Sequence, residues 1–542
     1  MRTTAKDGGA TTSVWTSASV PDYDTAPDSE TDVCIVGAGI AGLTTAYELV
    51  RRGTSVIVLD DGPIGGGETG RTSAHLASAV DDHFAHLEDK FGEAGAKLVA
   101  ESHAAAIDYI ETVVRELAIE CDFRRVDGYL FAPPGESNEK TERDLDRELA
   151  AARRAGLVAN KVPRAPLPFD TGPALVFANQ AEFHPLRYLR ALADAIVQLG
   201  GKIHTHVHVE GIEPGEPLTI KLANDRRIAC RAAVDATNGA MTSPLKMPLR
   251  QAAYRTYVLA FDLEPGLIPH GLYWDDADPY HYIRLARGDN EREILIVGGN
   301  DHRVGQGDPA RAWFELEGWT RRWIPVAGTL IARWSGQILE PADGPAHIGR
   351  SPELEHVYLV TGDSGNGLTH GTIAGMMIPE LMRGHRPTWS AVYDPDRSHL
   401  HSIGELVKEA AQSTAPYSDW LRGGDVSNID DIRPGHGALL RRGLHMIAAY
   451  RDEAGTCHMR SATCPHLRGV VHWNEAEKTW DCPCHGSRFD AYGRVLNGPA
   501  ATDLARVDTP SDVREPARKV PVAAGGDDRH AFVGIHDPED PA

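Results

Sequence analysis

Two short segments near the C-terminus, each carrying Cys and His at ligand spacing, constrain the fold more than any other feature of the sequence. Residues Cys464–His466 read C-x-H and residues Cys482–His485 read C-x-x-H, with residues 467–481 between them. Two thiolates and two imidazoles on two loops form a four-ligand metal site. Zinc sites usually combine a pair of Cys with a pair of His, whereas each pair here is mixed, which disfavours zinc.

The residues around these segments extend the pattern. Residues 480–490 read WDCPCHGSRFD, and a Gly-Pro-Ala turn follows at Gly498–Ala500. This stretch resembles the Rieske family of 2Fe-2S proteins over residues 426–515. In that family two Cys hold one iron and two His hold the other. The resemblance implies a small all-β domain with Cys464 and Cys482 on one iron and His466 and His485 on the second.

Several donors found in respiratory Rieske proteins are missing here. Those proteins carry a second Cys in the first loop, bridged to the Cys between the second-loop ligands, but Gly469 stands opposite Cys484 in this chain. Their Tyr near the second loop is Phe489 here, while Ser487 remains as a donor to a bridging sulfide. Each lost donor leaves the reduced cluster less stabilised. We therefore predict a potential in the lower to middle part of the Rieske range, which runs from about −150 to +300 mV.

A second motif lies near the N-terminus. The apolar run Asp32–Val36 is followed at once by the turn Gly37–Gly42, which reads G-x-G-x-x-G, and then by a helical pattern over Leu43–Arg52. A second apolar run over Ser55–Leu59 ends in Asp60. Strand, glycine turn, helix, strand and acid in this order indicate dinucleotide binding.

Each motif residue has a physical task. Gly37 permits the tight turn, Gly39 lets backbone amides approach a pyrophosphate, and Gly42 lets helix and strand pack closely. The helix N-terminus adds partial positive charge, and Asp60 accepts from the ribose hydroxyls. The motif alone does not separate FAD from NAD.

Three further stretches distinguish the two dinucleotides. Residues 65–75 (GGGETGRTSAH), 234–239 (VDATNG) and 357–371 (VYLVTGDSGNGLTHG), together with the motif, resemble the D-amino-acid-oxidase-like (DAO) superfamily of FAD oxidoreductases. The resemblance implies an α/β Rossmann-type FAD-binding domain with an inserted antiparallel-sheet substrate domain (α+β) at about 100–350. It also implies contacts to FAD from Arg71, Thr72, Ser73, Val209, Gly362, Asp363, Gly367, Leu368 and Thr369.

The resemblance also bears on how FAD is attached. Some relatives bind FAD covalently through a His in the region of Arg71, so we expect non-covalent FAD here, although His75 leaves the point slightly open. In the inserted domain, Arg333 or Arg255 is a candidate to pair with a substrate carboxylate, and His302 is a candidate proton acceptor. Structural ion pairs and a structural His are the competing interpretations. The sequence does not identify the substrate.

The composition of the chain excludes some classes of binding partner and indicates the cellular compartment. The formal charge of −22 argues against nucleic acid and against an anionic membrane surface. Seven Cys show no disulfide framework, and neither a signal peptide nor a membrane-length apolar run is visible, so we expect a cytoplasmic protein. The expected organisation is a tail at 1–30, an oxidoreductase at 31–395, a helical linker at 396–425, the Rieske domain at 426–515 and a tail at 516–542.

FAD accepts two electrons and a Rieske cluster accepts one, so the pair converts two-electron into one-electron chemistry. Only one dinucleotide fingerprint is visible, which favours a small organic substrate over NAD(P)H. The resemblance to the DAO superfamily implies oxidation at a C–N bond of an amine or amino-acid-like substrate, and we predict that the electrons leave through the cluster to an external carrier. Reverse flow for a reductase or monooxygenase reaction and a redox sensor are the alternatives. The sequence allows a homodimer, and it does not decide whether the two cofactors meet within one chain or across two.

Overall fold

The computed structural model describes most of the chain, in seven stretches. We refer to the described residues before the linker as the N-terminal part and to residues 415–507 as the C-terminal domain. The linker helix expected at His399–Ala411 lies outside the described residues, as does most of both tails. The described stretches are 9–18, 20–23, 29–136, 138–223, 225–289, 291–397 and 415–507.

A mostly parallel sheet forms the base of the N-terminal part. Its central strand β1 (Glu30–Val36) is almost fully buried and pairs in parallel with β2 (Val56–Leu59) and β10 (Arg227–Asn238). Apolar side chains on both faces are expected for a sheet covered by helices. Helix α1 (Ile40–Val50) packs against α6 (Gly367–Met382). The remaining strands are β7 (Lys202–His204), β8 (Val209–Glu213), β9 (Leu218–Leu222), β16 (His347–Arg350) and β17 (Val357–Thr361).

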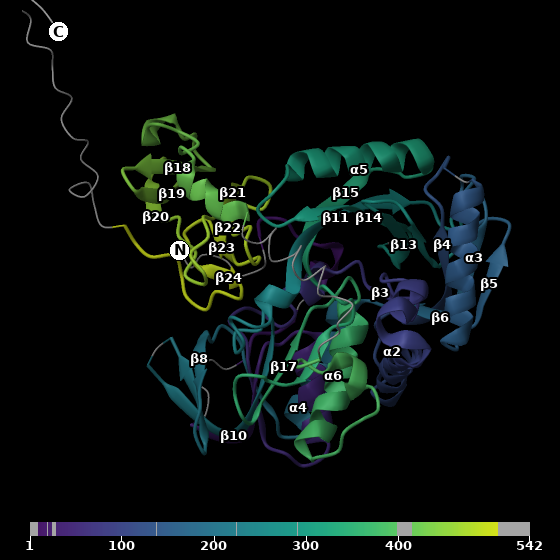
Figure 1. The fold of residues 1–542 in the computed structure, drawn as a ribbon, viewed down its shortest axis with the longest axis horizontal. Coiled ribbons are helices and arrows are strands. Elements are labelled where there is room, and N and C mark those ends of the chain that lie inside the picture. The colour runs from purple at the N-terminus through teal and green to yellow at the C-terminus, as the bar shows by residue number, and fades with distance from the viewer. Residues whose placement is uncertain are drawn as a thin grey trace, which may run out of the picture. The chain divides into compact units, whose positions relative to one another are not determined.

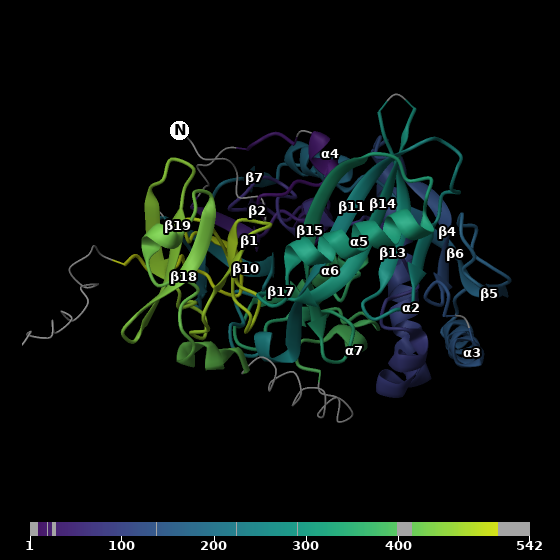
Figure 2. The same ribbon diagram turned by 90° about the horizontal axis from the view of Figure 1, so that it is seen from above.

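A second, largely antiparallel sheet follows the order β15-β11-β14-β13-β12-β4-β6-β3, and β5 pairs with β6. Helix α5 (Pro309–Trp323) lies across β11 and β14 (Figures 1 and 2). This sheet is the inserted domain expected from the sequence. The strands are β3 (His75–Leu76), β4 (Arg124–Phe131), β5 (Ala159–Val162), β6 (Ala174–Glu182), β11 (Gln251–Leu263), β12 (Leu272–Asp275), β13 (His281–Arg287), β14 (Glu293–Arg303) and β15 (Leu330–Pro341).

Four further helices and three 3-10 turns complete the N-terminal part. Amphipathic spacing in the sequence predicts a helix over Ala94–Leu117, but helix α2 (Phe84–Glu116) begins ten residues earlier, and its backbone breaks from helical geometry at Gly92, where φ is 69°. This break separates a short first segment, which helical periodicity alone does not reveal, from the expected one. The others are α3 (Glu139–Arg154), α4 (Pro185–Gln198), α7 (Ser390–Tyr393), η1 (Val14–Ser17), η2 (Glu68–Arg71) and η3 (Pro248–Arg250).

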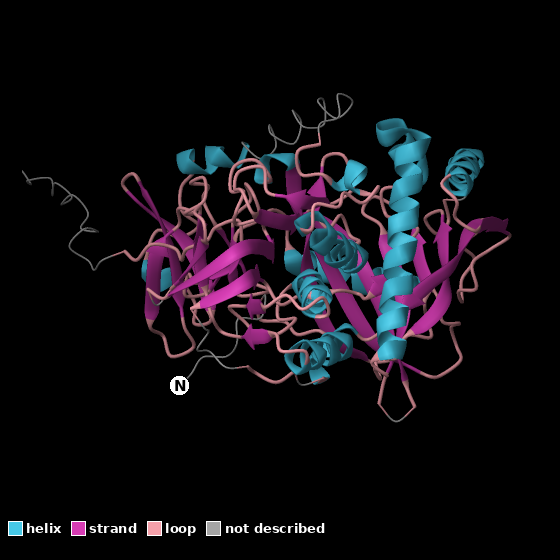
Figure 3. Ribbon diagram, turned by 90° about the horizontal axis from the view of Figure 1, so that it is seen from below, coloured by secondary structure: helices cyan, strands magenta, loops and turns pink. Residues whose placement is uncertain are grey.

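The C-terminal domain is built from two small antiparallel sheets, joined mainly by loops (Figure 3). Trp480 and Phe489 are fully buried at its centre, with Val470 and Val471 beside them. Across the described residues, no helix is both long and apolar enough to span a bilayer. The elements are η5 (Ala415–Leu421), η6 (Ile429–Asp431), β18 (His436–Arg442), β19 (His445–Arg451), β20 (Cys457–Ser461), β21 (His472–Asn474), β22 (Thr479–Asp481), β23 (Arg488–Asp490) and β24 (Val495–Asn497).

Candidate functional site

A cavity of about 310 Å³ opens where β1, β2, β10 and β17 end and the second sheet begins. Most of the residues that the sequence assigns to FAD line it. Gly42, Gly362 and Thr369 do not line the cavity themselves, but each is next in sequence to a residue that does. The predicted residues that line it are Gly37, Gly39, Asp60, Arg71, Thr72, Ser73, Val209, Asp363, Gly367 and Leu368.

The glycine turn forms one end of the cavity as its spacing requires. Gly37 has a φ of 110°, and a Cβ there would lie 2.4 Å from the carbonyl oxygen of Ala236. A Cβ on Gly42 would lie 1.9 Å from the carbonyl oxygen of Gly37, so only glycine permits this packing of α1 on the turn. The N-cap of α1 is Gly39, with no side-chain cap. The amide of Ile40 donates to Thr69 Oγ1 at 3.2 Å, and the glycine turn and the start of α1 line the cavity where an anion such as a pyrophosphate would bind.

Asp60 lies at the same end. Its carboxylate accepts the backbone amides of Ala38, at 2.6 Å, and Gly62, at 2.8 Å. Burial and the neighbouring Asp61 raise the pKa of the Asp60 carboxyl to about 7, although the two amides oppose the shift. Hydroxyl donors from a ribose would add hydrogen bonds that favour the charged form.

The other end of the cavity holds groups suited to an isoalloxazine ring. Helix α6 begins after Asn366 without a side-chain cap, so its amides face the cavity edge. Asp363 accepts the amide of Leu339 at 2.7 Å, and burial raises the pKa of the Asp363 carboxyl to about 7. Gln337 lines the cavity, and its buried Oε1 has no hydrogen-bond partner among the described residues. An N–H of a bound flavin would satisfy this orphaned acceptor, so the residues present fit FAD.

Acidic and aromatic side chains from the second sheet and the segment after β3 complete this end. Asp81, Trp274, Tyr280 and Tyr282 line the cavity together with Thr256, whose hydroxyl hydrogen-bonds Tyr282 Oη at 2.9 Å. Burial, reinforced by the negative charge of the adjacent carboxylate, raises the pKa of Asp81 to about 7. A carboxyl with a pKa near neutrality can accept and release a proton at physiological pH.

The predicted catalytic residues lie elsewhere. His302 Nδ1 donates to the carbonyl of Arg303 at 3.0 Å, and its Nε2 accepts from Tyr257 Oη at 2.7 Å. Arg333 is exposed, with its guanidinium 4.9 Å from the ring centroid of Trp313. Neither His302 nor Arg333 lines the cavity. Arg255, the second candidate for a substrate carboxylate, is buried and bonded to Ser335.

The four proposed cluster ligands converge at one tip of the C-terminal domain. The thiols of Cys464 and Cys482 are close enough for each to shift the pKa of the other, and the rings of His466 and His485 lie 5.0 Å apart at 89°. Within the described stretches, no group of three or more His, Cys, Asp or Glu surrounds a single metal position. A sulfur pair beside a nitrogen pair fits a two-iron cluster better than a mononuclear zinc site, since each iron then needs two protein ligands.

The surroundings of these ligands explain part of the sequence pattern. A Cβ on Gly469 would lie 2.5 Å from Cys484 Sγ, so the free thiol of Cys484 occupies the space that a larger residue would need. Ser487 Oγ accepts the amide of Ala500 at 3.0 Å, which leaves the hydroxyl proton available for a sulfide.

Tyr417, which the sequence did not single out, lies against the same ligand loops. Its hydroxyl donates to the carbonyl of Leu467 at 2.5 Å. Burial and the nearby thiols raise the pKa of Tyr417 to about 12. Trp420 Nε1 donates to the carbonyl of Arg468 at 3.0 Å, so two aromatic residues from η5 hold the first loop.

The cluster loops contact the flavin cavity directly. Gln337 Nε2 donates to the carbonyl of Gly486, next to the ligand His485, at 3.0 Å. His466 Nε2 donates to the carbonyl of Pro244, which leaves Nδ1 for iron. Residues 495–498, Ala500 and Ala501 also line the cavity. The C-terminal domain is therefore part of the cavity wall within a single chain.

Comparison with known proteins identifies both parts. The family model described as "FAD dependent oxidoreductase" (DAO) matches residues 32–381, and that of the Rieske [2Fe-2S] domain matches residues 424–509. The chain belongs to the DAO family of FAD-dependent oxidoreductases. This oxidoreductase binds FAD, and its Rieske domain binds a 2Fe-2S cluster.

Two relatives are similar to this chain over most of their own length. The oxidoreductase is 32% identical over 487 residues to YhfW of Bacillus subtilis (strain 168), which is named a Rieske 2Fe-2S iron-sulfur protein; the match covers 89% of this chain and 94% of YhfW. It is 27% identical over 385 residues to gamma-glutamylputrescine oxidoreductase of Escherichia coli (strain K12), covering 68% of this chain and 88% of that protein.

A solved structure agrees on the fold of the oxidoreductase part. Glycine oxidase from Geobacillus kaustophilus aligns with a TM-score of 0.58 and 19% identity, covering 68% of this chain and 100% of that one. At this identity the likeness supports the DAO fold and nothing finer about the reaction.

Proposed function

We propose that this oxidoreductase oxidises a cationic amine at FAD and passes the electrons singly to the Rieske cluster of the same chain, and from there to an external one-electron carrier. The observation that carries the proposal is Gln337, which lines the flavin cavity and also donates to the carbonyl of Gly486 beside His485. Bound FAD supplies two-electron acceptance and the cluster supplies one-electron transfer.

The cavity favours an amine without an adjacent carboxylate. Arg71 is the only Arg or Lys among the described residues that line it. Its guanidinium donates instead to the carbonyls of Thr11, at 2.6 Å, and Ser335, at 2.8 Å. A substrate carboxylate would thus find no free guanidinium and would face Asp81. An ammonium group suits this wall, because a carboxylate and aromatic faces both attract a cation.

We assign the proton acceptor role to Asp81. Oxidation of a C–N bond removes two electrons and two protons from the amine: a hydride leaves carbon, and nitrogen loses its proton to give an imine that water hydrolyses. The ammonium form must first lose a proton, because a protonated nitrogen has no lone pair to assist the departing hydride. Asp81, with its near-neutral pKa, is placed to take that proton.

The name of one relative is in line with an amine substrate, since it refers to gamma-glutamylputrescine. The structural neighbours are named instead for amino acids, such as glycine and L-proline. We therefore choose an experiment that separates these classes.

The test is anaerobic mixing of the FAD- and iron-loaded protein with matched pairs of substrates, for example a monoamine, a diamine and the corresponding α-amino acids. We expect the flavin absorbance to bleach with amines, followed by reduction of the cluster. Bleaching with the amino acids alone would refute the amine proposal, and bleaching without cluster reduction would refute the electron route. Flavin reduction only through a pre-reduced cluster would favour reverse flow.

A further inference from the structure

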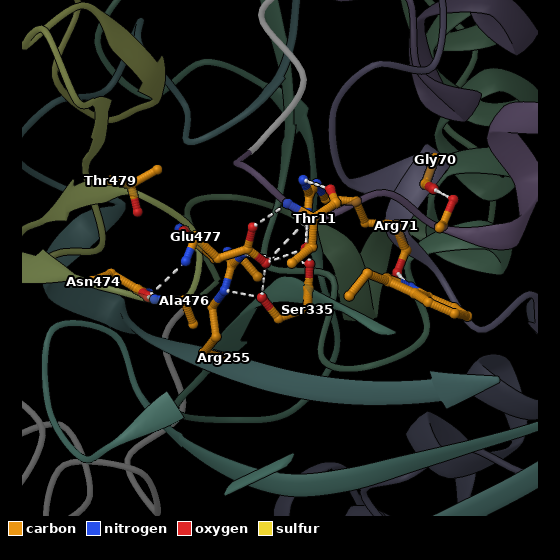
Figure 4. A network of polar contacts seen from close by, with 12 residues as sticks. Thr11, Gly70, Arg71, Arg255, Ser335, Asn474, Ala476, Glu477 and Thr479 are labelled. Carbon is orange, nitrogen blue, oxygen red and sulfur yellow. Dashed lines mark hydrogen bonds and ion pairs between the residues drawn. The ribbon is translucent and has the colours of Figure 1, made fainter. Parts of the chain in front are cut away.

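Glu477 is a buried carboxylate at the contact between the C-terminal domain and the N-terminal part. It lies in the turn between β21 and β22, and its side chain is 0% exposed. Its Oε1 lies 3.3 Å from Arg71 Nη1 and 3.2 Å from Arg255 Nη2, and Ser335 Oγ donates to the same oxygen. Figure 4 shows the carboxylate pointing between these side chains.

The start of the chain covers the same carboxylate. Thr11 donates to Glu477 twice, from Oγ1 to Oε1 at 2.6 Å and from its amide to Oε2 at 3.0 Å. The carbonyl of Thr11 accepts from Arg71 Nη2. Thr11, Arg71, Arg255 and Ser335, which lie far apart in the sequence, therefore all contact this one carboxylate.

The charges at this contact balance only when both sides are present. The N-terminal part contributes Arg71, Arg255 and Glu68, and the C-terminal domain contributes the following set: Glu477, Asp481 and Arg488. Each side alone carries an excess of one charge, positive on the first and negative on the second. A buried charge without a partner is costly, so docking of the two sides is favoured.

The protonation state of Glu477 follows from the same neighbours. Burial would raise the pKa of its carboxyl, but the guanidinium groups of Arg71, Arg255 and Arg488 outweigh burial and lower the pKa to about 2. The carboxylate is therefore charged at every pH at which the protein would be assayed.

The contact borders the FAD cavity. Arg71 and Glu68 both line that cavity. Glu68 Oε2 accepts the amide of Gln337 at 2.7 Å, and Glu68 Oε1 accepts from Asn497 Nδ2 at 3.0 Å. A displacement of the C-terminal domain would therefore move residues on both sides of the cavity wall.

We propose that Glu477 is a positioning residue that fixes the C-terminal domain on the N-terminal part, and that the FAD site is complete only in this docked arrangement. The Rieske domain is then a fixed wall of the flavin site and not a mobile carrier. This inference concerns the docking of the two parts and does not depend on which substrate the oxidoreductase takes.

The test compares Glu477→Gln with Glu475→Gln in the full-length, cofactor-loaded protein. Glu475 lies on the same turn, but its side chain is 49% exposed, and its polar contacts among the described residues are to His436, Trp473 and Lys478 of the C-terminal domain. We expect Glu477→Gln to weaken FAD binding about tenfold or more, because it leaves a buried positive charge unpaired. We also expect slower reduction of the cluster after photochemical reduction of the flavin, with an unchanged cluster EPR spectrum.

Glu475→Gln should behave like the unaltered protein, and Glu477→Asp, which keeps the charge, should recover most of the FAD affinity. Equal FAD affinity and equal transfer rates in Glu477→Gln and Glu475→Gln would overturn the proposal. None of these readouts uses an amine, so they stay informative if the proposed substrate class is wrong.

A milder variant covers the case in which Glu477→Gln does not fold. Asn497→Ala removes the hydrogen bond to Glu68 at the rim of the cavity while leaving all six charges in place. We expect FAD to dissociate several-fold faster, with iron content unchanged, because one hydrogen bond across the docking contact is lost. Unchanged FAD dissociation in Asn497→Ala would contradict a C-terminal domain that completes the site.

Discussion

The two ends of the flavin cavity are built in different ways. The nucleotide end consists mainly of backbone, namely the glycine turn and the start of α1, together with one carboxylate, Asp60. The ring end consists of side chains from distant segments, including Asp81, Tyr280 and Gln337. The first arrangement suits tight, generic binding of a dinucleotide, whereas the second specifies the substrate and the electron outlet.

The largest effect is expected at the ring end, from Asp81→Asn. This variant keeps the shape of the side chain but cannot accept a proton, and general base catalysis typically contributes about 10²- to 10⁴-fold. We expect the rate of flavin reduction by an amine to fall by that order, with FAD content unchanged. Rapid-mixing measurements at saturating amine provide the comparison, and a loss smaller than about threefold would remove Asp81 from the reaction.

The same residue predicts a pH dependence. Its raised pKa, about 7, means that Asp81 is protonated and inactive as a base at lower pH, so kcat/KM for an amine should rise with pH and level off above 7. In Asp81→Asn, the rise of kcat/KM with pH should disappear. A kcat/KM for the amine that falls as the pH rises towards 7 would contradict the role of Asp81 as proton acceptor. Other groups that act on the local charge are Asp82, His83, Tyr280, Asp301 and Glu340.

At the nucleotide end, Asp60→Ala should affect binding and leave the chemistry intact. Loss of hydrogen bonds to a charged group costs about 1.5–3 kcal/mol, which corresponds to FAD binding weaker by about tenfold to a hundredfold. Iron content should not change, because the cluster ligands lie in the C-terminal domain. Fluorescence titration of the protein freed of FAD, together with iron analysis, tests this, and parallel loss of iron would undermine the separation of the two sites.

The smallest effect is expected from Tyr417→Phe, which removes a hydroxyl near the cluster thiols. Loss of a dipole worth about 1 kcal/mol should lower the cluster potential by some tens of mV. The cluster potential is measured by spectroscopic redox titration. Trp420→Phe serves as the control, because it removes another hydrogen bond to the first ligand loop and so shows the effect of loosening that loop alone. An unchanged potential in Tyr417→Phe would mean that its hydroxyl only holds the carbonyl of Leu467.

The sequence predicted the features that depend on short spacing. The turn Gly37–Gly42, Asp60 and the four cluster ligands are each read from one or two local segments, because a loop or a strand–turn–helix unit fixes their relative positions. Both cofactors follow from these motifs, and the family comparisons confirm them.

The ring end could not be predicted in the same way. His302 lies on β14 and Arg333 on β15, and on these strands the side chain of His302 contacts Tyr257 while that of Arg333 contacts Trp313. Asp81 lies in an irregular segment with no motif. Glu477 reads as one more surface acid, because its partners Arg255 and Arg71 lie 222 and 406 residues away in sequence.

The central claim is that flavin and cluster exchange electrons within one docked chain. The most direct measurement is the rate of cluster reduction after photochemical reduction of the flavin, followed anaerobically over about a hundredfold range of protein concentration. A first-order rate that is independent of concentration is predicted, since an intramolecular step does not require two molecules to meet. A rate that rises in proportion to concentration, or no cluster reduction at all, would contradict the account.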